Sequence, residues 1–145
     1  MNALGFGDVA AGTDLPPFPI PLTMQRLVME AAANKDFTPI HHDRELTRAT
    51  GAPDPYANTM LVQAVFEATL REWMGLPGRL RKLQFSMRSF ATAGAVLSGH
   101  GRVTGTRADG GGGGYVDLEI WTESGGTRAA SGTATVWLPD NGVER

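Results

Sequence analysis

The polar residues best suited to chemistry lie together in one short segment, D-F-T-P-I-H-H-D at residues 36–43. Asp36 and His41 are five positions apart, and Pro39 restricts the backbone of Thr38 to extended conformations. The segment is therefore predicted to be a stiff, irregular loop. Such a loop can hold a carboxylate and an imidazole side by side, where the two groups could share and activate one water molecule.

A metal site is the main alternative for this segment, because His41, His42 and Asp43 are all possible ligands. Adjacent side chains of an extended segment point to opposite sides, and no further histidine lies nearby. Zinc sites usually need three or four converging ligands, so we expect no metal and no other cofactor. Asp43 is predicted to cap the following helix. The plainest structural role for Asp36 is a cap of its own turn, with the histidines as loop anchors.

The elements that must position this loop begin with an extended lead-in at residues 1–22, rich in glycine and proline, with room for one edge strand. A helix capped by Thr23 is predicted next, with one apolar stripe formed by Met24, Leu27, Val28 and Ala31. A second, short helix should start after Asp43 and end near Gly51.

The third predicted helix runs from Thr59 to Met74 and is capped by Asn58. Apolar residues surround most of its circumference, and the exception is a narrow polar stripe of Gln63, Glu67 and Arg71. The spacing of Glu67 and Arg71 predicts an ion pair between them. A helix that is apolar nearly all round must be enclosed by other elements.

After Gly78 the apolar residues alternate with polar ones, which is typical of strands. Four such segments occur, near residues 82–88, 97–104, 116–121 and 134–138, with glycine-rich links such as 110–114. They predict one antiparallel sheet, which can cover the buried helix only by curling around it. We therefore expect an α+β hot-dog fold in a single domain of residues 1–145. Its open edge and apolar flank predict at least a dimer.

Composition excludes several classes of partner. The net charge is −2, so broad attraction to nucleic acid or to an anionic membrane is not expected. No stretch reaches the roughly 18 apolar residues of a membrane span, and no signal peptide is evident. The absence of cysteine fits a reducing compartment, and we expect a cytoplasmic protein. A local basic cluster suits either a solvated strand edge or contact with phosphate; it comprises Arg79, Arg81, Lys82 and Arg88.

The segment from Lys35 to Gly75 resembles the hydratase-2 motif of the MaoC-like (R)-specific enoyl-CoA hydratases and dehydratases. That motif reads G-D-x-N-P-x-H-x-D, followed by a turn and A-H-G-M at the start of the central helix. The matching positions are Asp36, Pro39, His41, Asp43, Ala57 and Met60. Element order agrees over about residues 23–105, and the specific part spans near forty residues.

The sequence departs from the motif at Lys35, at Thr38 and at Asn58-Thr59, where the family usually has Gly, Asn and His-Gly. The run H-H-D-R and the altered helix start at Asn58-Thr59 look more like the small MaoC-like subunits of actinobacterial heteromeric hydratases that act on steroid side-chain CoA esters. A homodimer and a heteromer with a second MaoC-like chain both stay open, as does the acyl group.

The resemblance implies hydration of a 2-enoyl thioester, or the reverse dehydration, with an (R)-3-hydroxyacyl product. Asp36 and His41 would hold the water, with Asp36 accepting its proton. Backbone N–H groups of Thr59 and Met60 at the helix start would bind the thioester oxygen. Asn58 is either a plain cap of this helix or a contact for the substrate, and Tyr56, in the turn before the helix, is positioned in the sequence to line the acyl pocket. The basic cluster would suit the phosphates of either CoA or an acyl-carrier protein.

Two alternatives keep the same fold. A non-catalytic subunit could shape the acyl pocket of a partner, although loss of Asp36 or His41 would then be expected. A thioesterase would place its carboxylate on the central helix, where Glu67 is the only acid well inside. His100 is expected to be exposed and without a role, and the tryptophans are expected to fill the core and interfaces.

Overall fold

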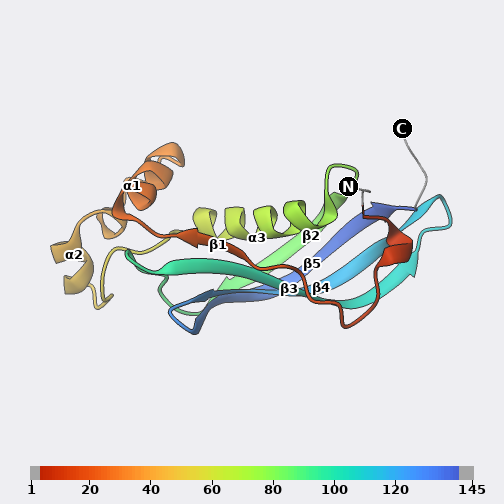
Figure 1. The fold of residues 1–145 in the computed structure, drawn as a ribbon. Helices are drawn as coiled ribbons and strands as arrows, with labels where there is room; N and C mark the ends of the chain where they lie inside the picture. Colours follow the sequence, from red (N-terminus) through yellow and green to blue (C-terminus); the bar gives the residue numbers. More distant parts are fainter. Residues whose placement is uncertain (1–3, 141–145) are drawn as a thin grey trace.

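The computed structural model describes residues 4–140, in which a five-stranded antiparallel sheet curves along one long helix (Figure 1). The strands follow the order β1-β3-β4-β5-β2 across the sheet. Their bounds are β1 Phe18–Pro21, β2 Arg79–Met87, β3 Val96–Ala108, β4 Gly113–Ser124 and β5 Thr127–Pro139. The helices are α1 Met24–Ala33, α2 Arg44–Ala49 and α3 Thr59–Met74, with 3-10 turns η1 Phe6–Asp8 and η2 Pro39–His41. The predicted α+β class is confirmed.

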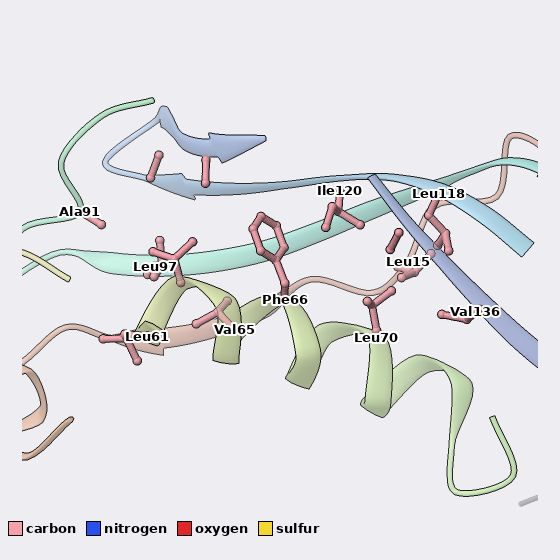
Figure 2. Packing of buried hydrophobic residues seen from close by; sticks show 14 of the residues in the cluster. Leu15, Leu61, Val65, Phe66, Leu70, Ala91, Leu97, Leu118, Ile120 and Val136 are labelled. Atoms are coloured by element: carbon pink, nitrogen blue, oxygen red, sulfur yellow. The ribbon is translucent and has the colours of Figure 1, made fainter. Parts of the chain in front are cut away.

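The core lies between α3 and the concave face of the sheet (Figure 2). Phe66 and Leu70 of α3 are completely buried, and they pack into a cluster with residues from β3, β4 and β5, among them Leu97, Ile120 and Val136. Burying a side chain of this size stabilises a fold by about 1.5–3 kcal/mol. The helix and the sheet therefore depend on one another for most of their buried surface.

Side-chain caps fix the start of all three helices at the predicted residues. Thr23 Oγ1 accepts a hydrogen bond from the backbone N–H of Arg26, and Asp43 Oδ1 accepts one from Leu46. Asn58 Oδ1 does the same for the N–H of Leu61, 2.9 Å away. The edge strand expected in the lead-in is β1, while residues 1–3 of that lead-in lie outside the described range.

Some expectations about burial and pairing were wrong. The helix α3 is enclosed on one side only, and Met60 on its outer face is 49% exposed. Glu67 accepts a hydrogen bond from Gln63 and not from Arg71, whose guanidinium instead reaches the carbonyl oxygen of Gly78. In α1, Leu27 and Ala31 are buried, but Val28 is 43% exposed, so the apolar stripe is narrower than predicted.

On the outer face of the sheet, His100 is half-buried and not exposed, because its ring stacks on that of Trp121 with centroids 5.5 Å apart. The strands also extend beyond the alternating segments. The largest difference is in β5, which begins at Thr127 although Ser131, Gly132 and Thr133 break the pattern. Pairing with β2 and β4 on either side holds this part of the strand in place. No helix within residues 4–140 is long and apolar enough to cross a membrane.

The sheet approaches α3 closely at Gly99 of β3. A Cβ atom at this position would overlap the hydroxyl of Thr69 and would lie 3.0 Å from Cγ1 of Val65, both on α3. A side chain here would therefore force the helix and the strand apart.

We expect Gly99→Ala to lower the free energy of unfolding by about 1–3 kcal/mol, the usual cost of overpacking a core. Gly105→Ala, on the same strand with open space at the Cβ position, is the matched control and should change it by less than about 0.5 kcal/mol. Urea unfolding followed by circular dichroism measures both. Equal effects of the two substitutions would contradict the close approach.

Candidate functional site

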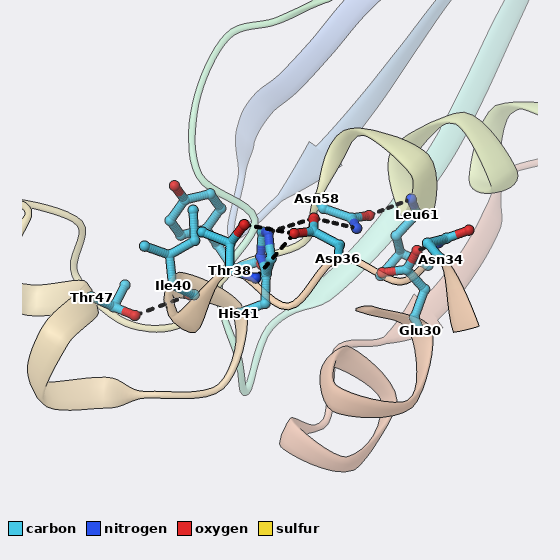
Figure 3. Close-up of polar contacts among 10 residues, drawn as sticks. Glu30, Asn34, Asp36, Thr38, Ile40, His41, Thr47, Asn58 and Leu61 are labelled. Carbon is cyan, nitrogen blue, oxygen red and sulfur yellow. Dashed lines mark hydrogen bonds and ion pairs between the residues drawn. The ribbon is translucent and has the colours of Figure 1, made fainter. Parts of the chain in front are cut away.

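The loop that carries Asp36 begins with a sharp reversal of the chain at the end of α1. Lys35 has a φ of 57°, the left-handed conformation that favours glycine, and it stands where the MaoC-like motif has glycine. The backbone N–H groups of Lys35 and Asp36 donate to the carbonyl oxygens of Ala32 and Ala31. This reversal turns Asp36 back toward the start of α3 (Figure 3).

Asp36 and His41 are in direct contact, as the sequence predicts. Asp36 Oδ2 lies 3.1 Å from His41 Nε2, and the imidazole is buried with 5% of its surface exposed. His41 Nδ1 lies 2.7 Å from the carbonyl oxygen of Tyr56. A carbonyl oxygen only accepts, so Nδ1 carries a proton; the contact of Nε2 with the carboxylate is a hydrogen bond only when Nε2 is protonated as well. The geometry thus suits an imidazolium–carboxylate pair.

Asp36 is held in its ionised form by donors on both sides. The Thr38 hydroxyl donates to Oδ1 at 2.7 Å, and the Asn58 amide donates to Oδ2 at 3.1 Å. These two hydrogen bonds, together with the Thr38 backbone N–H and the attraction of His41, outweigh partial burial and lower the pKa of Asp36 to about 2.

Asn58 has two functions at once. Its oxygen caps α3, as expected, and its nitrogen holds Asp36, a contact that capping alone does not predict. The hydroxyl of Thr38 was also missed by the sequence analysis, which considered only the restricted backbone of this residue and its departure from the family motif. The spacing D-x-T could have predicted this contact, because a threonine two residues after an aspartate can donate a hydrogen bond back to its carboxylate.

The pair faces a cavity of about 530 Å³ at the start of α3. The predicted site residues that line it are Asp36, His41, Tyr56, Asn58, Thr59, Met60 and Arg88. The ring of Tyr56 meets His41 edge-on at 5.5 Å and lies 4.7 Å from Phe90. Phe90 and Met87 form an apolar wall that the sequence analysis did not identify, since neither residue belongs to a motif.

The first turn of α3 offers free donors at this cavity. The side chain and carbonyl of Asn58 accept from the N–H groups of Leu61 and Val62. The N–H groups of Thr59 and Met60 precede the first intrahelical bond and have no acceptor within residues 4–140. With the positive end of the helix dipole, they form a site suited to a partial negative charge.

The four basic residues that are clustered in the sequence lie in two separate places in the structure. Arg88 lines the cavity, whereas Arg79, Arg81 and Lys82 lie toward the other end of β2. At about 3.3 Å per residue, Arg79 is roughly 30 Å from Arg88 along the strand. Only Arg88 is therefore placed to contact a molecule bound near Asp36. Within residues 4–140, no group of three histidine, aspartate or glutamate side chains is arranged to hold a metal ion.

The lowered pKa of Asp36 predicts a specific sensitivity to acid. The pKa of Asp36 has its ordinary value of 3.8 in the unfolded chain and a value of about 2 in the folded one. The ionised carboxylate therefore stabilises the fold fully above about pH 4, and this contribution to the free energy of unfolding is lost as the pH falls toward 2. Asp36→Asn should therefore lose less unfolding free energy than the wild type across that window. Urea unfolding at stepped pH measures this, with Asp43→Asn, which keeps a cap on α2, as control. Parallel curves for wild type and Asp36→Asn would contradict the pKa shift.

No family model and no curated protein sequence matches this chain. Its fold nevertheless matches solved structures of low sequence identity. A chain of the ChsH1-ChsH2 complex from Mycobacterium tuberculosis aligns with a TM-score of 0.81 and 18% identity, over 90% of this chain and 98% of that one. The (R)-hydratase from A. caviae involved in PHA biosynthesis has a TM-score of 0.81 and 22% identity, with the same coverage.

The MaoC-like dehydratase from Rhodospirillum rubrum aligns with a TM-score of 0.83 and 18% identity, over 97% of this chain and all of the other. The matched structures thus include an (R)-hydratase and a MaoC-like dehydratase, the classes of protein that the motif around Asp36 and His41 resembles. The chain has the hot-dog fold of the MaoC-like dehydratases and R-hydratases.

Proposed function

We propose that this protein hydrates a 2-enoyl thioester to an (R)-3-hydroxyacyl thioester or catalyses the reverse dehydration. The observation that carries the proposal is the contact of Asp36 with His41 at a cavity that is also lined by Thr59 and Met60, the residues with free N–H groups at the start of α3. A carboxylate–imidazole pair beside an oxyanion site provides what water addition to a conjugated thioester requires. The (R)-hydratase and dehydratase structures that share the fold support the same reaction class.

In the hydration direction, a water molecule bound by Asp36 and His41 adds its oxygen to C3 of the enoyl group, and the pair takes up its proton. The electrons of the double bond move toward the thioester oxygen, and the resulting enolate takes one proton from the pair at C2. Asp36 alone, with a pKa of about 2, is a weak base. Transfer of the His41 proton toward C2 removes the positive charge beside the carboxylate and so strengthens it as a base. We therefore propose that the two residues act as one unit.

The enolate oxygen would lie at the start of α3, against the N–H groups of Thr59 and Met60. Preorganised donors of this kind contribute about 2.7–4 kcal/mol each to transition-state stabilisation. Thr59 occupies the position at which the motif has glycine, and its side chain leaves the backbone donor in place. Tyr56 and Phe90 would then contact the acyl group, and Arg88 a phosphate of CoA or of a carrier protein.

The main alternative is a non-catalytic subunit that shapes a partner's pocket. Complexes among the matching structures, ChsH1-ChsH2 and HadBC, support assembly with a second chain. The open rim of the cavity, where Met60 and Phe90 are each 49% exposed, supports it too. A thioesterase is less well supported, because Glu67 does not line the cavity and is engaged by Gln63.

We expect the protein to hydrate 2-enoyl-CoA esters in a spectrophotometric assay of the conjugated double bond. Asp36→Asn and His41→Ala should each lower kcat/KM by about 10²–10⁴-fold, since each removes half of the proton-transfer pair.

Two neighbours in the loop are matched controls for those variants. His42→Ala changes the exposed histidine next to His41, and Asp43→Asn changes an aspartate that caps α2 outside the cavity. Both should keep wild-type rates. Wild-type activity of the Asp36 and His41 variants would refute the catalytic assignment, and hydration that appears only after a second hot-dog chain is added would place the site in a heteromer.

For Arg88→Ala we expect KM for a CoA ester to rise about tenfold with little change in kcat, as expected for the loss of one charged contact to phosphate. The N-acetylcysteamine thioester of the same acid, which has no phosphate, should be hydrated equally by wild type and variant. Arg79→Ala, at the far end of β2, is the control. Equal losses on both substrates would show that Arg88 has some other function.

A further inference from the structure

The carboxylate of Asp36 is surrounded by as many donors as it can accept from (Figure 3). A carboxylate offers about four lone-pair positions, two on each oxygen. The backbone N–H and the hydroxyl of Thr38 donate to Oδ1, over 3.3 Å and 2.7 Å. At Oδ2, the Asn58 amide and Nε2 of His41 each lie 3.1 Å away. With His41 protonated, each oxygen accepts from two donors, and a catalytic water has no direct position on the carboxylate.

Three of these four donors are fixed in place. The Thr38 N–H belongs to the main chain, and Asn58 is buried and caps α3 with its oxygen. His41 is buried too, and the carbonyl oxygen of Tyr56 holds its other ring nitrogen. An N–H group that donates also has no lone pair with which to accept. None of these three groups can therefore link a water molecule to Asp36.

The fourth donor, the Thr38 hydroxyl, differs in both respects. Thr38 is exposed and lines the cavity, and its side chain does not cap the turn η2 that follows it. A hydroxyl can accept hydrogen bonds while it donates one, and no group in the described part of the chain donates to this oxygen. The Thr38 hydroxyl is thus the donor to Asp36 that can also accept a hydrogen bond from a water molecule in the cavity.

We infer that the Thr38 hydroxyl relays the proton of the catalytic water to Asp36. The inference rests on the proposed function, because it gives a route to the proton uptake by the Asp36–His41 pair. As the water oxygen bonds to C3 of the enoyl group, one water O–H bond breaks and its proton passes to Oγ1 of Thr38. The proton already on Oγ1 passes at the same time to Oδ1 of Asp36.

The relay leaves every group in the state in which it started. Thr38 ends as a neutral hydroxyl, because it gains one proton and loses one. The enolate takes the Nε2 proton of His41 at C2, and Asp36 then returns its own proton to His41. One water has been added to the double bond, and the imidazolium–carboxylate pair is restored.

This route depends on a departure from the family motif. Thr38 stands where the MaoC-like motif has asparagine. An asparagine amide can donate a hydrogen bond to a carboxylate, but its nitrogen has no free lone pair with which to take up the proton of a water. Threonine at this position therefore supplies a donor to Asp36 and, in addition, a proton that can be transferred.

Three substitutions of Thr38 test the relay in the hydration of 2-enoyl-CoA. Thr38→Ser keeps the hydroxyl and should keep kcat close to the wild-type value. Thr38→Val keeps the shape but puts a methyl group in place of the hydroxyl, so kcat should fall about 10²-fold, as for the loss of a proton-transfer group. Thr38→Ala leaves room for a water in that place and should lie between the two. KM should change little, because the hydroxyl acts in the transition state.

The solvent isotope effect provides a second measurement. Two protons move together in the wild type and in Thr38→Ser, so kcat should fall along a curve as D₂O replaces H₂O. Thr38→Val has lost the relay, and its plot should be a straight line. Thr104→Val is the matched control, because it removes an exposed hydroxyl that donates to the carbonyl oxygen of Asp117 on the sheet. Circular dichroism melting checks that every variant folds.

Two results would overturn the relay. The first is a kcat of Thr38→Val at or above the wild-type value. That is expected of a hydroxyl that only stabilises the charge of Asp36, since its loss would raise the pKa of Asp36 and make the carboxylate a stronger base. The second is an equal loss of kcat in Thr38→Ser and Thr38→Val, which would show that the shape of the side chain matters and not its proton.

Failure of the relay is distinguishable from failure of the proposed function. Either of those two results would leave the hydration proposal standing as long as Asp36→Asn and His41→Ala are inactive. Wild-type rates in Asp36→Asn and His41→Ala would instead refute the proposed function and the relay together. If hydration requires a second hot-dog chain, all variants are measured in that complex.

Discussion

The hydrogen bond between the Asn58 amide and Asp36 joins the two parts of the molecule on which the site depends. On one side is a loop that the reversal at Lys35 directs back toward the helix. On the other side is α3, whose position is fixed by the core that it shares with the curved sheet. A second polar contact, between His41 Nδ1 and the carbonyl oxygen of Tyr56, joins the same loop to the turn just before α3. These two contacts together set the distance between base and oxyanion site.

The electrostatics of the site follow from that arrangement. Donors from Thr38 and Asn58 stabilise the negative charge of Asp36, and the buried imidazole of His41 lies between this carboxylate and the Tyr56 carbonyl. A strongly stabilised carboxylate is a poor base by itself. The arrangement becomes useful because the charge on His41 changes during proton transfer, which makes the pair more reactive than its resting pKa suggests.

Much of this structure could be predicted from the sequence, for identifiable reasons. Thr23, Asp43 and Asn58 are strong caps followed by apolar periodicity, so the helix starts were correct. The pairing of Asp36 with His41 followed from a motif that short-range geometry enforces. Long-range contacts were not accessible in the same way. The stacking of His100 on Trp121, the open outer face of α3 and the apolar wall at Phe90 all depend on which strands are neighbours, and no local pattern encodes that.

The double use of Asn58 narrows the substitutions that evolution can accept at this position. Serine, threonine and aspartate are good helix caps, and a survey of capping alone would treat them as equivalent. A serine or threonine hydroxyl can both donate and accept, but it is a single atom and cannot take the places of both the Asn58 oxygen and the Asn58 nitrogen; an ionised aspartate only accepts. Aspartate would also place a second negative charge beside the first. Among the common capping residues, asparagine alone satisfies both requirements, so variation here should report on the chemistry of the site as well as on the stability of the helix.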